Sequence, residues 1–157
     1  MIAGAEAWGP TVLRGILGLI YVMHGWLGAA VLGPEALAGY VVRMGYPPAV
    51  ADLLAWYLIV AHLVGGALML AGFLTRAAAL AQLPIMASAV FFLHWPQGFF
   101  MRAVTVETPG GSATVAGGYE YDLLVLFATI ALALLGPGAL SVDAIRAERG
   151  HHRFQLP

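Results

Sequence analysis

Three histidines and a carboxylate stand in stretches of sequence that otherwise hold almost no charge. They are His24, His62, His94 and Glu120. Histidine titrates near neutral pH, and neighbouring groups can move the pKa of a glutamate toward the same range. Such side chains can hydrogen-bond a carbonyl or hydroxyl group and can pass protons. Trp26 and Tyr121 lie near them in the sequence and complete the set of candidate ligand-binding residues.

Each of these residues also has a structural interpretation. His24 could hydrogen-bond a neighbouring helix, and His94 could lie at a membrane interface. Glu120 could interact only with the N-terminus of a helix. Histidines on facing helices can ligate haem, and His with Glu can ligate zinc or iron. Because the histidines are expected at different depths, we predict neither haem nor a metal ion, and no motif identifies a catalytic residue.

Four long uncharged runs indicate the elements that must position these side chains. They contain 20, 23, 25 and 20 residues, at 15–34, 53–75, 77–101 and 123–142. A helix needs roughly 20 apolar residues to cross a bilayer core, where backbone groups must be satisfied within the segment. At 61% hydrophobic and 10% charged residues, the chain has too few charges for a soluble surface. We therefore predict an all-α polytopic membrane protein, a four-transmembrane-helix bundle in a single domain.

The predicted spans are about 11–33, 50–74, 76–100 and 118–136, within one membrane domain over 1–157. Residues 35–46 are expected to form a short amphipathic surface helix. Residues 101–116 are expected to form an outer β-hairpin around Pro109-Gly110-Gly111. A tail helix is predicted over 141–149, capped by Ser141. Pro84 should bend the third span.

Arginine placement predicts the orientation. With four spans, most arginines fall on the side of the two termini: Arg14, Arg76, Arg146, Arg149 and Arg153. The positive-inside rule then places both termini in the cytoplasm of a bacterial or archaeal cell, with the chain in its inner membrane. Gly28-Ala29-Ala30 resembles a signal-cleavage site, but Glu6 favours a retained first span. The net charge of −1 gives no basic face for nucleic acid, and the absence of cysteine excludes thiol chemistry.

The rise of a helix gives approximate depths. At about 1.5 Å per residue, His24 lies roughly 15 Å beyond Arg14, and His94 roughly 27 Å beyond Arg76. His62 falls near the bilayer centre. We therefore expect the histidines and Glu120 to line a polar pocket that opens to the outer side. Structural or turn roles are assigned to Gly25, Gly65, Gly66, Arg76 and Gly118, since small residues allow close packing of helices.

Several stretches of the chain resemble the DoxX family of small integral membrane proteins. They are Arg14 to Leu19 with Met23-His24-Gly25, His62 to Gly66 with Leu70 to Arg76, Gly117 to Tyr121, and Gly136 to Asp143. The resemblance covers about residues 11–145 and implies a four-helix membrane bundle. Glu120 and Arg76 match family positions. The family commonly has Glu where His62 stands, and often Lys near Gly28, so the site implied by the resemblance is altered here.

The family is similar to the membrane subunit of a thiosulfate:quinone oxidoreductase, and its members are often linked to oxidative-stress or sulfur redox systems. Together with the depths of the polar residues, this resemblance favours a redox-linked membrane subunit that binds a quinone or similar lipophilic molecule in the outer half of the bundle. It leaves open whether such an oxidoreductase subunit catalyses or only binds. Its expected partners are the lipid bilayer, a redox partner protein and further copies of itself. The alternatives are a non-catalytic scaffold or assembly partner of another protein, and a small transporter.

Overall fold

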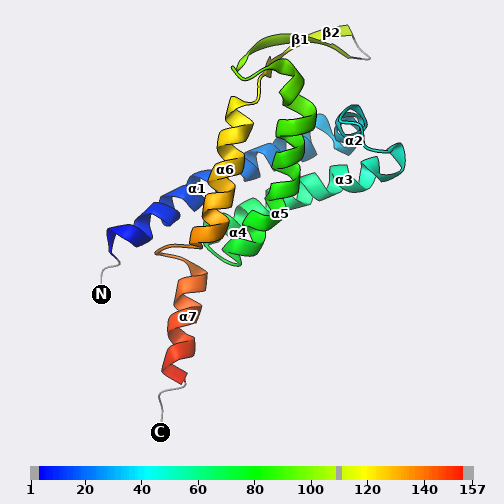
Figure 1. Cartoon of the computed structure of the whole chain (residues 1–157). Helices are drawn as coiled ribbons and strands as arrows, with labels where there is room; N and C mark the ends of the chain where they lie inside the picture. The colour runs from blue at the N-terminus through cyan, green and yellow to red at the C-terminus, as the bar shows by residue number, and fades with distance from the viewer. Residues whose placement is uncertain (1–3, 109–110, 154–157) are drawn as a thin grey trace.

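The computed structural model describes residues 4–108 and 111–153, which are mostly helical (Figure 1). The elements are α1 (Ala5–Trp26), the π-helix η1 (Leu27–Leu32), α2 (Pro34–Arg43), α3 (Pro48–Val60), the π-helix η2 (Ala61–Gly65), α4 (Gly66–Ala71), α5 (Thr75–Ser88), the π-helix η3 (Ala89–His94), the 3₁₀ turn η4 (Trp95–Gln97), β1 (Arg102–Thr108), β2 (Gly111–Gly117), α6 (Glu120–Leu135) and α7 (Val142–Arg153).

Three continuous helices in this part of the chain are long and apolar enough to cross a membrane. They cover Glu6–Leu32, Pro48–Ala71 and Thr75–Gln97, with 27, 24 and 23 residues. Glycines with positive φ end the first two, at Gly33 and Gly72, because only glycine adopts that backbone without strain. The chain is therefore a multi-pass membrane protein. The fourth predicted span corresponds to α6, which is shorter, at 16 residues.

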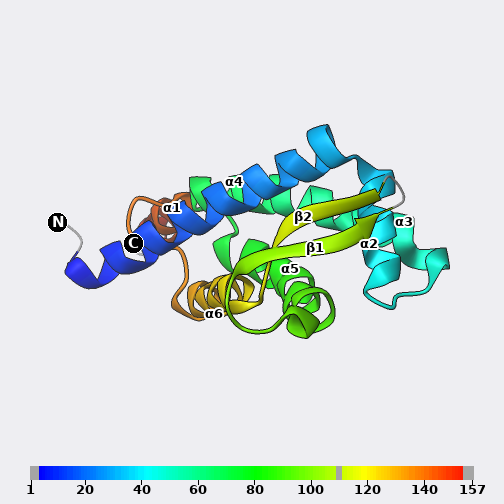
Figure 2. The ribbon, with the colours of Figure 1, turned by 90° about the horizontal axis from the view of Figure 1, so that it is seen from above.

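The long helices pack in two pairs that cross one another (Figures 1 and 2). α1 lies against η2 and α4, and α5 lies against α6. The short helix α2 packs on α3, and its buried side chains Leu37 and Val41 share a small core with Ile59. The larger core lies between the two pairs and contains Leu17, Met69, Val90 and Leu132. Large apolar side chains also cover the outside, as expected of helices that face lipid.

The strands β1 and β2 form the hairpin beyond one end of α5 and α6, while α7 lies beyond the other end (Figure 1). The strands pair antiparallel, from Arg102 opposite Gly117 to Thr108 opposite Gly111. The predicted turn at Pro109-Gly110 lies outside the described residues. The tail helix predicted over 141–149 corresponds to α7.

The buried Arg14 links several segments at the end of the molecule away from the hairpin. The guanidinium of Arg14 donates five hydrogen bonds to main-chain carbonyls: Met69, Leu70, Pro137, Ala139 and Leu140. These bonds use every N–H that an arginine has. Arg14 therefore joins α1 to the end of α4 and to the segment between α6 and α7.

The start of α7 is attached to the turn between α4 and α5. Ser141 Oγ accepts a hydrogen bond from the N–H of Ala144 and thereby caps α7. The carboxylate of Asp143 accepts the N–H groups of Leu74 and Thr75, at 2.9 and 3.0 Å, and so satisfies donors at the start of α5. This places the tail helix on the same end of the bundle as Arg14.

Candidate ligand cavity

A cavity of about 220 Å³ lies between the two crossed helix pairs, on the side nearer α2 and the hairpin. Its walls come from α1 and η1, from α3 and η2, from α5 and η3, and from the first turns of α6. Apolar side chains such as Leu58, Ile85 and Met86 make up most of the surface. The polar lining residues are Tyr21, His24, His62, His94, Tyr121 and Asp122. An apolar pocket with a few convergent polar groups is typical of a small-molecule site.

All three π-helical segments in the described chain border this cavity. η1 contributes Leu27 and Gly28, η2 contributes His62, and η3 contributes Ala89 and His94. A π-helical turn holds one more residue than an α-helical turn, so the side chains around it are turned relative to a regular helix. Such turns occur frequently at functional sites. Their concentration around one cavity marks it as the candidate site.

Close helix contacts bring His62 to the cavity wall. A Cβ atom on Gly25 would lie 2.8 Å from the main-chain nitrogen of Leu63 and 3.0 Å from the Cβ of His62. A Cβ on Gly66 would lie 2.8 Å from the main-chain nitrogen of Val22. Glycine at these positions therefore lets α1 approach η2 and α4 far more closely than other residues would allow.

His62 is the most deeply buried of the three histidines, with 5% of its surface exposed. Its ring meets the ring of Tyr21 edge-on, with the centroids 5.0 Å apart. Its Nδ1 atom has no hydrogen-bond partner among the described residues. That nitrogen is itself inaccessible, and the side chain of Gln82, from α5, interacts with the ring. Burying a polar atom costs free energy unless it is paired. Because His62 also lines the cavity, its other ring nitrogen, Nε2, is the one available to a bound molecule.

Hydrogen bonds orient the other two histidines. The Nδ1 of His24 is 2.9 Å from the carbonyl of Ile20, so it carries the proton. In the neutral ring this leaves the lone pair of Nε2 as an acceptor. The Nδ1 of His94 pairs with the carboxylate of Asp122, from α6. A carboxylate on one ring nitrogen fixes the orientation of the imidazole and leaves Nε2 for a ligand.

Tyr21, which lines the cavity, is hydrogen-bonded to Thr129 of α6. Thr129 Oγ1 donates to the carbonyl of Val125 at 2.7 Å, so it accepts a hydrogen bond from the Tyr21 hydroxyl at 2.6 Å. Both side chains are buried and satisfied. They connect α1 to α6 below the histidines.

Two residues expected at the site lie elsewhere. Glu120 does not line the cavity; its Oε1 accepts the N–H of Met101 at 2.8 Å and so holds the loop that leads to β1. Trp26 is 59% exposed and also lies outside the cavity lining. The structure pairs His94 with Asp122 and not with Glu120. Tyr121 does line the cavity, as expected.

The residues assigned structural roles occupy close contacts and turns. Gly25 and Gly66 lie at the close helix contacts described above, and Gly65 lies close to the side chain of Gln82. Gly118 has φ +106° and donates its N–H to the side-chain oxygen of Gln97. The guanidinium of Arg76 donates to the carbonyl of Leu134.

Sequence reasoning did not include Asp122 and Tyr21 among the site residues. A signal for Asp122 was present, because it stands three, four and seven residues before Val125, Leu126 and Thr129, which form the buried face of α6. Within residues 4–108 and 111–153, no set of three His, Asp or Glu side chains lies close enough together to hold a metal ion. The polar groups that line the cavity are imidazole, hydroxyl and carboxylate groups, which can hydrogen-bond a ligand and exchange protons with it.

Comparison with known proteins identifies one relationship. The DoxX family model matches residues 9–95, more than half of the chain. No curated protein and no solved structure matches the chain. The matched region contains all three histidines of the cavity but ends before α6, which supplies Asp122.

Proposed function

Since the chain belongs to the DoxX family and is an integral membrane protein, we propose that it is a redox-linked membrane subunit that binds a quinone or a similar lipid-soluble molecule in the histidine-lined cavity. The observation that carries this proposal is a mostly apolar cavity between the long helices, whose few polar lining groups include histidines from three helices, namely His24, His62 and His94. Ionisable groups at membrane depth are costly and are functional candidates by default.

The ring nitrogens match what a quinone head group offers. A quinone presents two carbonyl oxygens, and its reduced form presents two hydroxyl groups. His62 in the tautomer that carries a proton on Nε2 would donate to a carbonyl, and in the other tautomer its Nε2 would accept from a hydroxyl. The Nε2 of His24 would accept from the hydroxyl form. The cavity would thus hold both redox states without rearrangement of its walls.

His94 and Asp122 would handle protons at the outer end of the cavity. A hydroquinone hydroxyl would give its proton to Nε2 of His94, and the carboxylate of Asp122 would stabilise the resulting imidazolium. The pair is partly exposed, with 24% of the His94 side chain and 15% of the Asp122 side chain accessible. This partial exposure is consistent with a proton that would leave His94 toward the outer solution.

We also propose that α6 is a fourth membrane span. Its outward-facing side chains are large and apolar, including Leu124, Phe127 and Leu134, and lipid is the environment that suits them. At about 1.5 Å per residue, α6 spans roughly 24 Å, less than a hydrocarbon core of about 30 Å. The bilayer would thin locally beside it or the helix would draw on its flanking residues.

With four spans both termini lie on one side, and the arginine distribution places that side in the cytoplasm. The chain has no cysteine, so single cysteines can report on topology. Ala103→Cys, at an exposed position of β1 beyond the third long helix, should react with a membrane-impermeant maleimide from outside intact cells. Ala147→Cys, in α7, should react only after the cells are opened. The reverse pattern would overturn this orientation.

The binding proposal is tested by extraction. The protein would be purified in lipid nanodiscs from native membranes, extracted with organic solvent, and its quinones quantified per polypeptide by absorbance. We expect near-stoichiometric quinone in the wild type and a loss of most of it in His62→Ala. Val64→Ala is the matched control, because Val64 is two residues away on the same helix and faces outward. Equal quinone content in both variants would refute the proposal.

A second function is favoured by the surface beside the hairpin. Phe100 is 73% exposed, and β1 and β2 make a sheet of only two strands. Exposed strand edges and aromatic side chains can pair with another chain. A scaffold role would follow if a partner protein copurified in stable complex while the extraction yielded no small molecule.

A further inference from the structure

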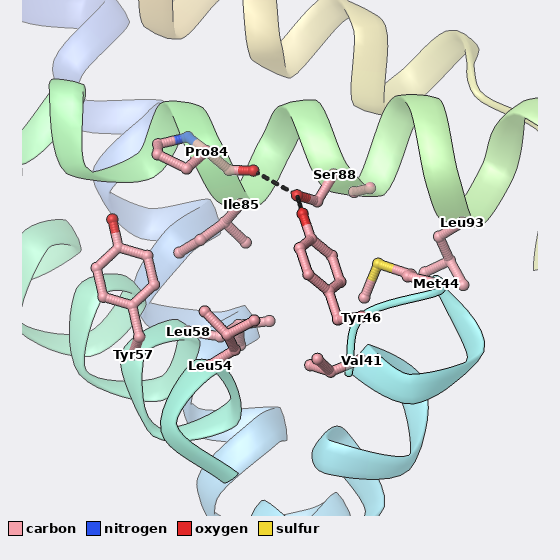
Figure 3. Close-up of a pocket in the computed structure, with 11 residues that line it drawn as sticks. Val41, Met44, Tyr46, Leu54, Tyr57, Leu58, Pro84, Ile85, Ser88 and Leu93 are labelled. Atoms are coloured by element: carbon pink, nitrogen blue, oxygen red, sulfur yellow. Dashed lines mark hydrogen bonds between the residues drawn. The ribbon is translucent and has the colours of Figure 1, made fainter. Parts of the chain in front are cut away.

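A second cavity, of about 150 Å³, lies next to the first between α3, α5 and the segment that follows α2 (Figure 3). Met44 and Tyr46 bound it on one side, Leu54 and Tyr57 on another, and Pro84 and Ser88 on the third. The segments that form it belong to two of the three long apolar helices, so it lies within the membrane region of the chain. We call it the apolar groove.

The polar atoms at the apolar groove are already paired. The Tyr46 hydroxyl lies 2.7 Å from Ser88 Oγ, which donates to the carbonyl of Pro84 at 2.8 Å (Figure 3). The Tyr57 hydroxyl donates to the carbonyl of Ala81 at 2.6 Å. The rest of the lining is aliphatic apart from the thioether of Met44. A ligand group in this groove therefore finds no free hydrogen-bonding partner, which suits a hydrocarbon and disfavours a polar head group.

The apolar groove and the histidine-lined cavity share a wall. Leu58, Ile85 and Ala89 line both of them. One of the three is alanine, with a side chain of a single methyl group. Ala89 is also the first residue of η3, the π-helical segment that ends at His94 of the histidine-lined cavity. The two spaces are therefore adjacent compartments on either side of three small or flexible aliphatic residues.

We propose that the two compartments form one bipartite site, in which the ring of a tailed quinone occupies the histidine-lined cavity and its isoprenoid or alkyl tail passes Ala89 into the apolar groove. This inference rests on the proposed function and adds the class of ligand, namely a ring with a hydrocarbon chain. The occupant is identified by continuity with the polar compartment and by the lack of any free polar group in the groove.

The groove would give the tail a place to lie, but little free energy of binding. Lipid is as apolar as the lining of the groove, so a tail gains little free energy by leaving the bilayer for the groove. A head group buried between helices must nevertheless keep its tail somewhere. The groove leads the tail from the head-group cavity toward lipid, so that tailed molecules can seat their ring without forcing the helices apart.

Photolabelling tests this placement directly. The probe is a benzoquinone with a ten-carbon chain that ends in an alkyl diazirine, bound to the full chain in lipid nanodiscs and irradiated. The competitor is the same ring without the chain. We expect labelled peptides from residues 41–58 and 84–93, and we expect the tail-less ring to suppress that labelling.

A substitution in the groove provides the second measurement. Leu54 lines the groove and not the histidine-lined cavity, so Leu54→Trp fills the groove from its own side. The substitution should reduce saturable labelling about tenfold, because the tail must displace the added indole. Leu53→Trp is the matched control, since Leu53 is the next residue and is 70% exposed. It should label as the wild type does.

The outcomes separate the two proposals. Labelling at other segments, with suppression by the tail-less ring intact, would overturn the bipartite site and leave the proposed function standing. Labelling of the groove that the tail-less ring does not suppress would mean that the groove holds membrane lipid, and would also overturn the inference. The absence of any saturable labelling would remove the proposed function and the bipartite site together.

Discussion

Replacement of Arg14 by lysine should destabilise the protein without changing its charge. The five carbonyls that Arg14 contacts come from the end of α4 and from the segment between α6 and α7. A lysine ammonium has three donors at a single point, so at least two of these five hydrogen bonds are lost. Both segments then lose part of their attachment to α1.

The magnitude follows from the bonds lost. A hydrogen bond to a charged group contributes about 1.5–3 kcal/mol in a soluble protein, and hydrogen bonds between membrane helices average about 0.6 kcal/mol. Two lost bonds therefore correspond to about 1–6 kcal/mol. We expect a central loss of about 3 kcal/mol, which is roughly 6–12 °C in apparent midpoint for a chain of this length.

The assay is thermal inactivation in detergent. Membrane proteins usually unfold irreversibly, so the measured quantity is the temperature at which half of the protein leaves the monodisperse peak in gel filtration at a fixed heating time. Arg76→Lys is the matched control, because Arg76 is exposed and donates one hydrogen bond of 3.3 Å, to the carbonyl of Leu134. It should lose less than about 1 kcal/mol. Equal midpoints for the two variants would refute the structural role given to Arg14.

Three further predictions follow from other contacts. Gly18→Ala should destabilise the protein by about 1–3 kcal/mol, because the new Cβ would lie 2.8 Å from the carbonyl oxygen of Gly66. Gly15→Ala, with open space around the new Cβ, should be neutral or stabilising by up to about 1 kcal/mol. The same midpoint assay compares the two variants. Burial tends to raise the pKa of Asp143, but hydrogen bonds from Thr75 and Leu74 and the charge of Arg146 outweigh it and hold that pKa below its usual value of 3.8. The folded-state pKa is depressed, so this stabilisation is complete above pH 4 and is lost as the pH falls through the folded value; midpoints measured from pH 7 to pH 3 should show this loss in the wild type and not in Asp143→Asn. A double-mutant cycle of Tyr21→Phe and Thr129→Val should give a coupling of about 0.6 kcal/mol and no more than about 1.7 kcal/mol; zero coupling would contradict the hydrogen bond between them.

The sequence predicted the long helices well because charge and glycine mark their ends. Arg14, Asp52 and Arg76 bound runs that correspond to the three candidate spans. The third run was expected to reach residue 100, but its helix ends at Gln97, before Gly98 with φ +87°. The pattern Pro96-Gln97-Gly98 carries that stop signal, and the apolar residues that follow it concealed the stop.

The π-helical segments could not be predicted from the sequence. No residue type marks a π turn, and a contact from a distant part of the chain can support one. η2 illustrates this, since the side chain of Gln82, from α5, donates to the carbonyl of Ala61 at 2.6 Å. These turns affect the direction in which His62 and His94 point. The expectation that the histidines line one pocket therefore rested on their approximate depths and not on the faces of the helices that carry them.

The choice between Glu120 and Asp122 shows where periodicity fails in a membrane protein. The two carboxylates are two residues apart at the start of α6, about 200° around the helix, so only one can face the bundle. In a soluble helix the apolar positions would mark the inner face. Here Leu124 and Phe127 are outward-facing and apolar as well, so apolar positions do not distinguish the inner face of α6 from its outer face. The inner face is marked instead by the buried Thr129, seven residues after Asp122. Polar side chains in register along such a helix are thus the better guide, and they identify Asp122 as the partner of His94.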